Sequence, residues 1–108
     1  MRRFTTPTLP YSVPLNITAA QIHVDIKQGP KKLRKGGTDI LNLAYDSETN
    51  MTTFSLRLSQ EETGSFTSGK DAVTQVNWIF EDGTRGATAE RKISIYDNLL
   101  NEVIEYED

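Results

Sequence analysis

The most regular pattern along the chain is an alternation of apolar and polar residues with a period of two. In residues 21–27, Ile22, Val24 and Ile26 alternate with polar residues. A half-buried β-strand has this period because successive side chains point to opposite faces of a sheet. Gly29-Pro30 follows, and the strand should end there because proline has no N–H for a sheet hydrogen bond.

Two further alternating runs predict a hairpin. The apolar residues on one side of these runs are Leu41, Leu43 and Tyr45 in the first, and Phe54, Leu56 and Leu58 in the second. The polar stretch of residues 46–50 lies between them, as expected of a hairpin loop.

The next segments predict a helical turn and a second hairpin. Ser59-Gln-Glu-Glu62 has the spacing of a capping box, which predicts a short helical turn near residues 59–63. Residues 72–80 alternate again, with Trp78 on the face that carries Val76 and Phe80, so we expect Trp78 to pack in the core. Asp82-Gly83 predicts a hairpin turn, and residues 85–95 are its partner strand.

The C-terminal end has a different pattern. Leu99, Leu100, Val103 and Ile104 recur at helical spacing after Asp97-Asn98, which favours a short C-terminal helix. Residues 105–108 are mostly acidic and are expected to be a frayed tail. Together, six or seven short strands predict an all-β fold, a two-sheet antiparallel β-sandwich that forms one domain over residues 1–108.

Composition excludes several classes of function. The net charge of −3 argues against a general nucleic-acid binder, which carries a strong positive excess. The chain has no cysteine and only one histidine, His23, so thiolate metal sites and most Ser-His-Asp arrangements are excluded. No apolar run approaches the roughly 20 residues of a membrane span. We therefore expect no catalytic residues, no metal, no cofactor and no membrane contact.

Two segments partly match motifs that bind phosphate or calcium, but each lacks residues that the motif requires. Residues 64–70 match the first seven positions of a phosphate-binding P-loop, but Asp71 stands where Ser or Thr should hold Mg²⁺, and a strand follows instead of a helix. Residues 46–50 begin like a calcium loop, but Met51 and Arg57 replace the required glycine and glutamate. Ordinary turns account for both matches.

Two surface features remain as candidates for binding. Four of the twelve basic residues cluster at Lys31, Lys32, Arg34 and Lys35. They could contact an anionic partner, although a charged edge or loop that discourages strand-to-strand aggregation is favoured. The apolar stripe Leu99, Leu100, Val103 and Ile104 either closes one end of the sandwich or forms a protein interface. Residues 95–108 hold five acids and no base, so a head-to-tail assembly could use the separation of charge.

Several segments together resemble a known group of proteins. They are residues 2–10, residues 22–29, the corner Leu56-Arg-Leu-Ser-Gln-Glu-Glu-Thr-Gly-Ser-Phe66, the strand Val73-Thr-Gln-Val-Asn-Trp78, and residues 95–104. In this order they resemble short proteins encoded near tail and baseplate genes in phages and prophages of Gram-positive bacteria. More loosely, they are similar to the immunoglobulin-like N-terminal domain of phage baseplate upper proteins.

The resemblance implies an immunoglobulin-like sandwich without enzymatic activity, which acts as a structural or adaptor module of a tail or baseplate. Its partners would be other virion or tail proteins, or further copies of itself. The protein would be located in the bacterial cytoplasm before assembly and then in the virion. The alternative is a module that binds glycans or a host surface, with Trp78 or Tyr45 as the stacking ring. The group supplies no catalytic or ligand motif to transfer to this chain.

Overall fold

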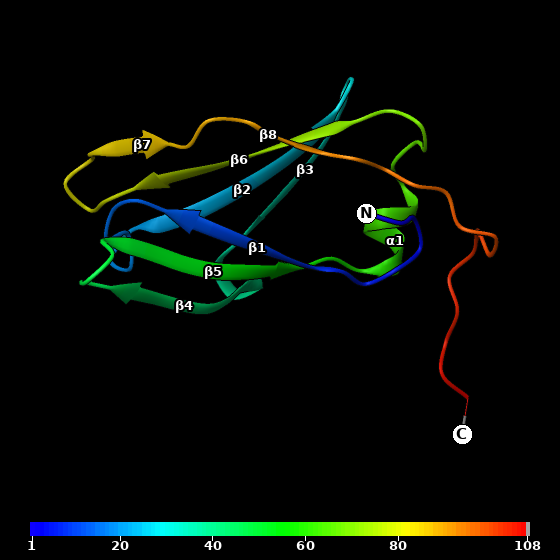
Figure 1. Ribbon diagram of the computed structural model, residues 1–108, viewed down its shortest axis with the longest axis horizontal. Coiled ribbons are helices and arrows are strands. Elements are labelled where there is room, and N and C mark those ends of the chain that lie inside the picture. The colour runs from blue at the N-terminus through cyan, green and yellow to red at the C-terminus, as the bar shows by residue number, and fades with distance from the viewer. Residues whose placement is uncertain (108) are drawn as a thin grey trace.

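The computed structural model describes residues 1–107 and shows two antiparallel sheets packed against each other (Figure 1). One sheet has the strand order β1-β5-β4, and the other has the order β3-β2-β6, with β7 and β8 both pairing with the far edge of β6. The predicted two-sheet antiparallel β-sandwich is therefore confirmed. The strands are β1 (Thr8–Val13), β2 (Gln21–Gln28), β3 (Lys31–Gly36), β4 (Ile40–Asp46), β5 (Met51–Arg57), β6 (Ala72–Ile79), β7 (Arg85–Ala87) and β8 (Arg91–Ile93).

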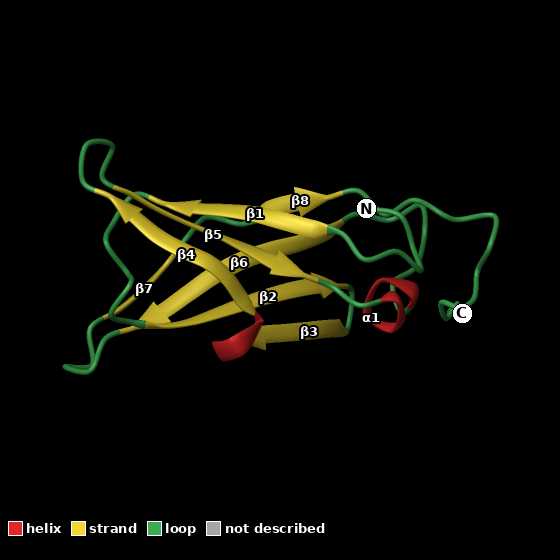
Figure 2. Ribbon diagram, turned by 90° about the horizontal axis from the view of Figure 1, so that it is seen from below, coloured by secondary structure: helices red, strands yellow, loops and turns green. Residues whose placement is uncertain are grey.

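Two short helical pieces join the sheets. The 3-10 helix η1 (Gly37–Asp39) lies between the end of β3 and the start of β4 and carries the chain from one sheet to the other (Figure 2). The α-helix α1 (Gln60–Gly64) lies between β5 and β6 and returns the chain to the second sheet. The helical turn predicted near residues 59–63 is confirmed.

The alternating residues of β2 and β6 build the core from one side, as predicted. Ile22, Val24 and Ile26 are no more than 5% exposed, and they lie opposite Trp78, Val76 and Thr74 in the β2–β6 register. Trp78 is 8% exposed, so the prediction that it packs in the core is confirmed. A Cβ on Gly86 of β7 would lie 2.5 Å from the indole carbon Cζ2, which shows that the ring packs directly on the β7 backbone.

Tyr11 stacks on a neighbour within its own sheet and connects the two sheets through its buried hydroxyl. Its ring stacks on Phe54 of the neighbouring strand, with 5.2 Å between the ring centroids. Its hydroxyl lies 2.8 Å from Oγ1 of Thr74 on β6 in the opposite sheet. The Thr74 hydroxyl itself donates to the carbonyl of Asp25, so the Tyr11 O–H is the donor in the contact between the sheets. Burial raises the pKa of the Tyr11 phenol, more than the Thr74 contact lowers it.

The capping box at the start of α1 is formed as predicted, and it also ties α1 to β3. The Glu62 amide donates to the Ser59 hydroxyl, and the Ser59 amide donates back to the Glu62 carboxylate at 2.8 Å. Lys35 of β3 donates to the same carboxylate at 2.9 Å. Partial burial raises the pKa of Glu62, but the hydrogen bonds from Ser59 and Lys35 outweigh it and hold the pKa below its ordinary value.

Strand β4 differs from the prediction that Leu41, Leu43 and Tyr45 share one face. The register of β4 against β5 shifts between Leu41 and Ala44, and Asn42 has a positive φ of 55°. Leu41 therefore lies opposite the half-buried Ser55, whereas Tyr45 lies opposite the buried Thr52. The two side chains lie on opposite faces of the sheet because the bulge inserts an extra residue into the alternation.

The partner strand predicted over residues 85–95 is broken into β7 and β8. The break occurs because the Thr88 side chain replaces a backbone acceptor: its hydroxyl accepts the hydrogen bond from the Val76 amide at 3.1 Å. The Gln75 carboxamide donates to the Thr88 carbonyl beside it. These side-chain bonds displace the regular ladder over residues 88–90.

The predicted C-terminal helix is wrong: residues 97–107 contain no helix. The backbone amides that a helix would use are bonded to side chains instead. The Leu100 amide donates to the Asn98 side chain, and the Ile104 amide donates to the Gln60 side chain. The tail predicted at residues 105–108 is exposed and has no regular secondary structure over residues 105–107, and Asp108 lies outside the described residues.

We expect the Glu62→Gln variant to lose stability in a pH-dependent way. At neutral pH the free energy of unfolding should fall by about 1 kcal/mol, because the charged acceptor of the cap and of Lys35 is lost. Since the folded-state pKa of Glu62 is lowered, its contribution is present above the unfolded value of about 4.3 and is lost as pH falls through the folded pKa. Urea unfolding at a series of pH values measures this.

The matched control is Glu61→Gln, which changes an exposed acid in the same helical turn. We expect it to change stability little at any pH. A loss at Glu62→Gln that stays constant down to the most acidic pH would contradict the assigned role of the carboxylate charge.

Candidate functional site

The C-terminal segment, defined here as residues 99–107, leaves the sandwich and carries large apolar side chains into solvent. It forms the red end of the ribbon, beyond α1 (Figure 1). Leu99 is fully exposed and Tyr106 is 95% exposed. The other exposed apolar residues of the segment are Leu100, Val103 and Ile104. The stripe predicted at residues 99–104 therefore does not close the end of the sandwich.

Side-chain interactions fix the C-terminal segment at Ile104 and fix the chain just before it at Asp97. The Ile104 amide donates to Oε1 of Gln60 at 2.9 Å, and Nε2 of Gln60 donates to the Ile104 carbonyl at 2.8 Å. Upstream, Arg3 forms an ion pair with Asp97 at 3.1 Å. The Asn98 amide and Arg3 hold the pKa of Asp97 below its ordinary value. The segment is thus attached to α1 while its apolar side chains remain exposed.

The basic cluster predicted at residues 31–35 is split by the pleat of β3. Lys31 and Lys35 lie opposite Gln28 and Val24, whose side chains face the interior. Lys31 lies over the buried Phe66 ring at 5.6 Å, and Lys35 pairs with Glu62. These two lysines therefore have structural partners and do not belong to an outward patch.

Lys32 and Arg34 point to the outer face of the second sheet, on either side of Asp25. Arg34 donates two hydrogen bonds to the Asp25 carboxylate, at 2.8 and 3.3 Å. This contact raises the pKa of Arg34. Lys32 lies 4.0 Å from the same carboxylate. The arginine side chain is still 60% exposed, so its remaining N–H groups face solvent.

Strand register brings three further bases to this outer face. Residues opposite each other in paired strands project from the same face. Lys27 lies opposite Lys32, Lys92 lies opposite Val73, and Arg85 lies opposite Ile79. We call this surface the basic face; its charged residues are Lys27, Lys32, Arg34, Arg85, Lys92 and one acid, Asp25. Sequence reasoning missed Lys27, Arg85 and Lys92 because they come from three separate strands.

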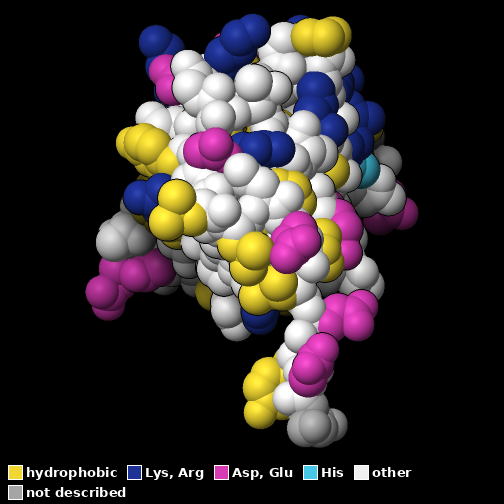
Figure 3. All heavy atoms as spheres, turned by 90° about the vertical axis from the view of Figure 1, so that its right-hand side faces the viewer, with side chains coloured by type: hydrophobic (Ala, Val, Ile, Leu, Met, Phe, Trp, Pro, Cys, Tyr) yellow, Lys and Arg dark blue, Asp and Glu magenta, His cyan; other side chains and the backbone are white. Residues whose placement is uncertain are grey.

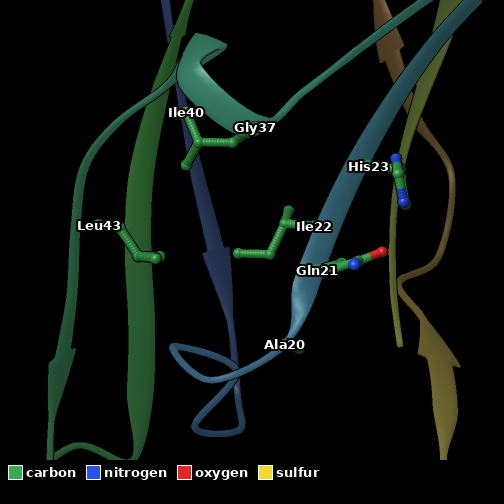
Figure 4. Close-up of a pocket in the computed structure, with 7 residues that line it drawn as sticks. All are labelled: Ala20, Gln21, Ile22, His23, Gly37, Ile40 and Leu43. Carbon is green, nitrogen blue, oxygen red and sulfur yellow. The ribbon is translucent and has the colours of Figure 1, made fainter. Parts of the chain in front are cut away.

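An apolar groove adjoins the basic face where β3 has ended. It has a volume of about 390 Å³ and is lined by Ala20, Gln21, Ile22, His23, Gly37, Ile40 and Leu43. Ile22, Ile40 and Leu43 point into it from the two sheets, whereas His23 points away toward the outer face (Figure 4). Sequence reasoning missed this groove because its walls come from β2 and β4.

His23 belongs to both hollows and joins them. It also lines a second hollow of about 210 Å³ on the basic face, whose lining includes both polar residues, such as Arg34 and Arg85, and the apolar Ile79. Arg85 donates to the Asn77 side chain at 3.2 Å. Chemically, the groove offers an apolar surface, and the guanidinium groups beside it offer N–H donors suited to carboxylates.

Charge is segregated on the end of the molecule that carries the C-terminal segment. Figure 3 shows Lys and Arg side chains mainly in the upper part of this view, and Asp and Glu side chains on the lower part and along the protruding chain. Among residues 1–107, no group of three His, Cys, Asp or Glu side chains is placed to hold a metal ion. The arrangement is therefore one of surfaces that differ in charge and polarity.

Comparisons with known proteins add no relative. No family model, no curated protein and no solved structure matches the chain. The resemblance to phage tail and baseplate proteins stays a prediction. In the described part of the chain, no helix is both long enough and apolar enough to cross a membrane.

We expect Gln60→Ala to release the C-terminal segment without unfolding the sandwich. Both hydrogen bonds to Ile104 would be lost, so hydrogen exchange of the Ile104 amide should accelerate by about two- to tenfold. NMR-detected exchange measures this, with Glu61→Ala as a control at the neighbouring exposed residue of α1. Unchanged exchange at Ile104 would show that Gln60 does not hold the segment.

Proposed function

We propose that this protein is a non-enzymatic structural or adaptor module of a phage or prophage tail or baseplate, acting through protein–protein contacts. The observation that carries the proposal is the C-terminal segment, whose large apolar side chains are exposed although hydrogen bonds fix the chain beside α1. Apolar side chains gathered on an exposed segment are typical of a surface that binds another protein.

The sandwich fits the role of a rigid spacer that presents this segment. Its core is continuous between the sheets, and Tyr11 and Thr74 connect them. The setting in a tail or baseplate is supported by the resemblance of residues 2–10, 22–29, 56–66, 73–78 and 95–104. Such a protein is made in the host cytoplasm and then joins the virion.

The alternative of a glycan-binding module receives less support from the ring positions. Trp78 is buried against the β7 backbone, so it offers no stacking face to a sugar. Tyr45 is half-buried, and its hydroxyl donates to Asn50 at 2.7 Å. The contact surface favoured here is therefore the C-terminal segment.

The double variant Leu100→Asp with Val103→Asp tests the proposal. Both side chains are exposed, at 45% and 42%, so the free energy of unfolding should change by less than about 0.5 kcal/mol. Mass spectrometry of tail particles purified after induction of the native host should find the wild-type chain in stoichiometric amounts and the variant strongly depleted.

A matched control is Leu15→Asp, which changes a leucine of similar exposure, 43%, in the loop after β1. That loop lies at the end of the sandwich away from the C-terminal segment (Figure 1). We expect this variant to enter particles normally. Absence of the wild-type chain from particles, or unfolding of the isolated double variant, would refute the proposal.

A further inference from the structure

We propose that the C-terminal segment of one copy docks on the basic face and the adjoining apolar groove of a second copy. The inference rests on the interface proposed above and names its partner: another molecule of the same chain. The docked segment and the receiving face are different surfaces, so the contact is head to tail and generates a ring or an open chain.

Charge complementarity is the first argument for this partner. The strand residues of the basic face include five bases and one acid, which sum to a charge of +4, in a protein whose net charge is −3. Asp25 is only 15% exposed and is already paired with Arg34. The C-terminal segment carries Glu102, Glu105 and Glu107 and no base. The two surfaces are therefore suited to each other.

Apolar complementarity is the second argument. The acids of the segment alternate with exposed apolar residues, and the basic face adjoins a groove walled by Ile22, Ile40 and Leu43. On the face itself, Ile79 is 38% exposed. A partner that is only anionic, such as polyphosphate, would leave this apolar surface uncovered, whereas the segment offers both kinds of side chain.

The length of the C-terminal segment also fits the distance from the groove to the far end of the basic face. Ile22 points into the groove and Lys27 points to the outer face, so the docked segment must cross β2 beyond the end of β3. Between these two residues β2 advances by roughly 17 Å at about 3.3 Å per residue. Residues 99–107 of the segment span about 26 Å when extended, which leaves length for this crossing. Leucine side chains at one end of the segment can thus reach the groove while Glu107 at the other end reaches Lys27. The bonds to Gln60 leave the residues on both sides of Ile104 exposed.

Sedimentation velocity of the full chain over a concentration series tests the proposal with two charge-reversed variants. One carries Glu102→Lys, Glu105→Lys and Glu107→Lys in the segment. The other carries Lys27→Glu, Lys32→Glu and Lys92→Glu on the basic face and keeps the Arg34–Asp25 pair. The wild type should associate, more weakly at high salt because exposed charges are screened. Each variant alone should associate about tenfold more weakly or worse.

Mixing the two variants is the decisive step. Each segment then meets a face of opposite charge, so the mixture should associate more strongly than either variant does alone. The control reverses two exposed bases elsewhere, Arg57→Glu and Lys70→Glu, and should associate as the wild type does. Circular dichroism verifies that each variant is folded.

The proposal is overturned if the wild type stays monomeric at every concentration, or if folded variants fail to associate when mixed. It is also overturned if the wild type stays monomeric yet binds polyphosphate through the basic face, since that surface would then be an anion site. Depletion of the Leu100→Asp, Val103→Asp variant from particles without self-association would keep the proposed function and reject only this partner.

Discussion

The pleat of strand β2 is the constraint on which both the core and the charged surface depend. It sends Ile22, Val24 and Ile26 inward against β6, and it sends His23, Asp25 and Lys27 outward. Because β3 and β6 pair with β2 in fixed register, the same alternation orders their side chains. A slip of β2 by one residue would place His23, Asp25 and Lys27 in the core and the isoleucines in solvent. The core therefore determines where the bases gather.

Contacts from the other elements join the two sheets, and the C-terminal segment lies outside the core. Tyr11 connects the sheets through Thr74, and Glu62 ties α1 to Lys35 of β3. The N-terminal residues pair with the chain after β8, where Arg2 lies in a parallel bridge with Tyr96. Beyond that bridge the apolar residues no longer meet the core. The basic face and the acidic C-terminal segment thus lie on one molecule without forming ion pairs with each other within the residues that the structure describes.

Local pattern was enough to predict β2, β6, the β4–β5 hairpin, the capping box and the burial of Trp78, but β1 and β3 were not predicted. Each predicted feature depends on neighbours in sequence or on a simple period. The bulge at Asn42, the break at Thr88 and the missing C-terminal helix depend on distant partners: Gln60, for example, bonds the Ile104 backbone across 44 positions. The basic face was missed for the same reason, because only strand register shows that Lys27, Arg85 and Lys92 share it.

An NMR titration can detect whether the C-terminal segment binds the basic face. The ¹⁵N-labelled full chain, kept dilute enough to remain monomeric, is mixed with an excess of unlabelled peptide of residues 97–108. We expect chemical-shift changes at the amides of residues 22–27 and around Arg34, Asn77 and Arg85, which diminish as salt is added. Changes confined to the β1-β5-β4 sheet, or no changes at all, would contradict binding at the basic face.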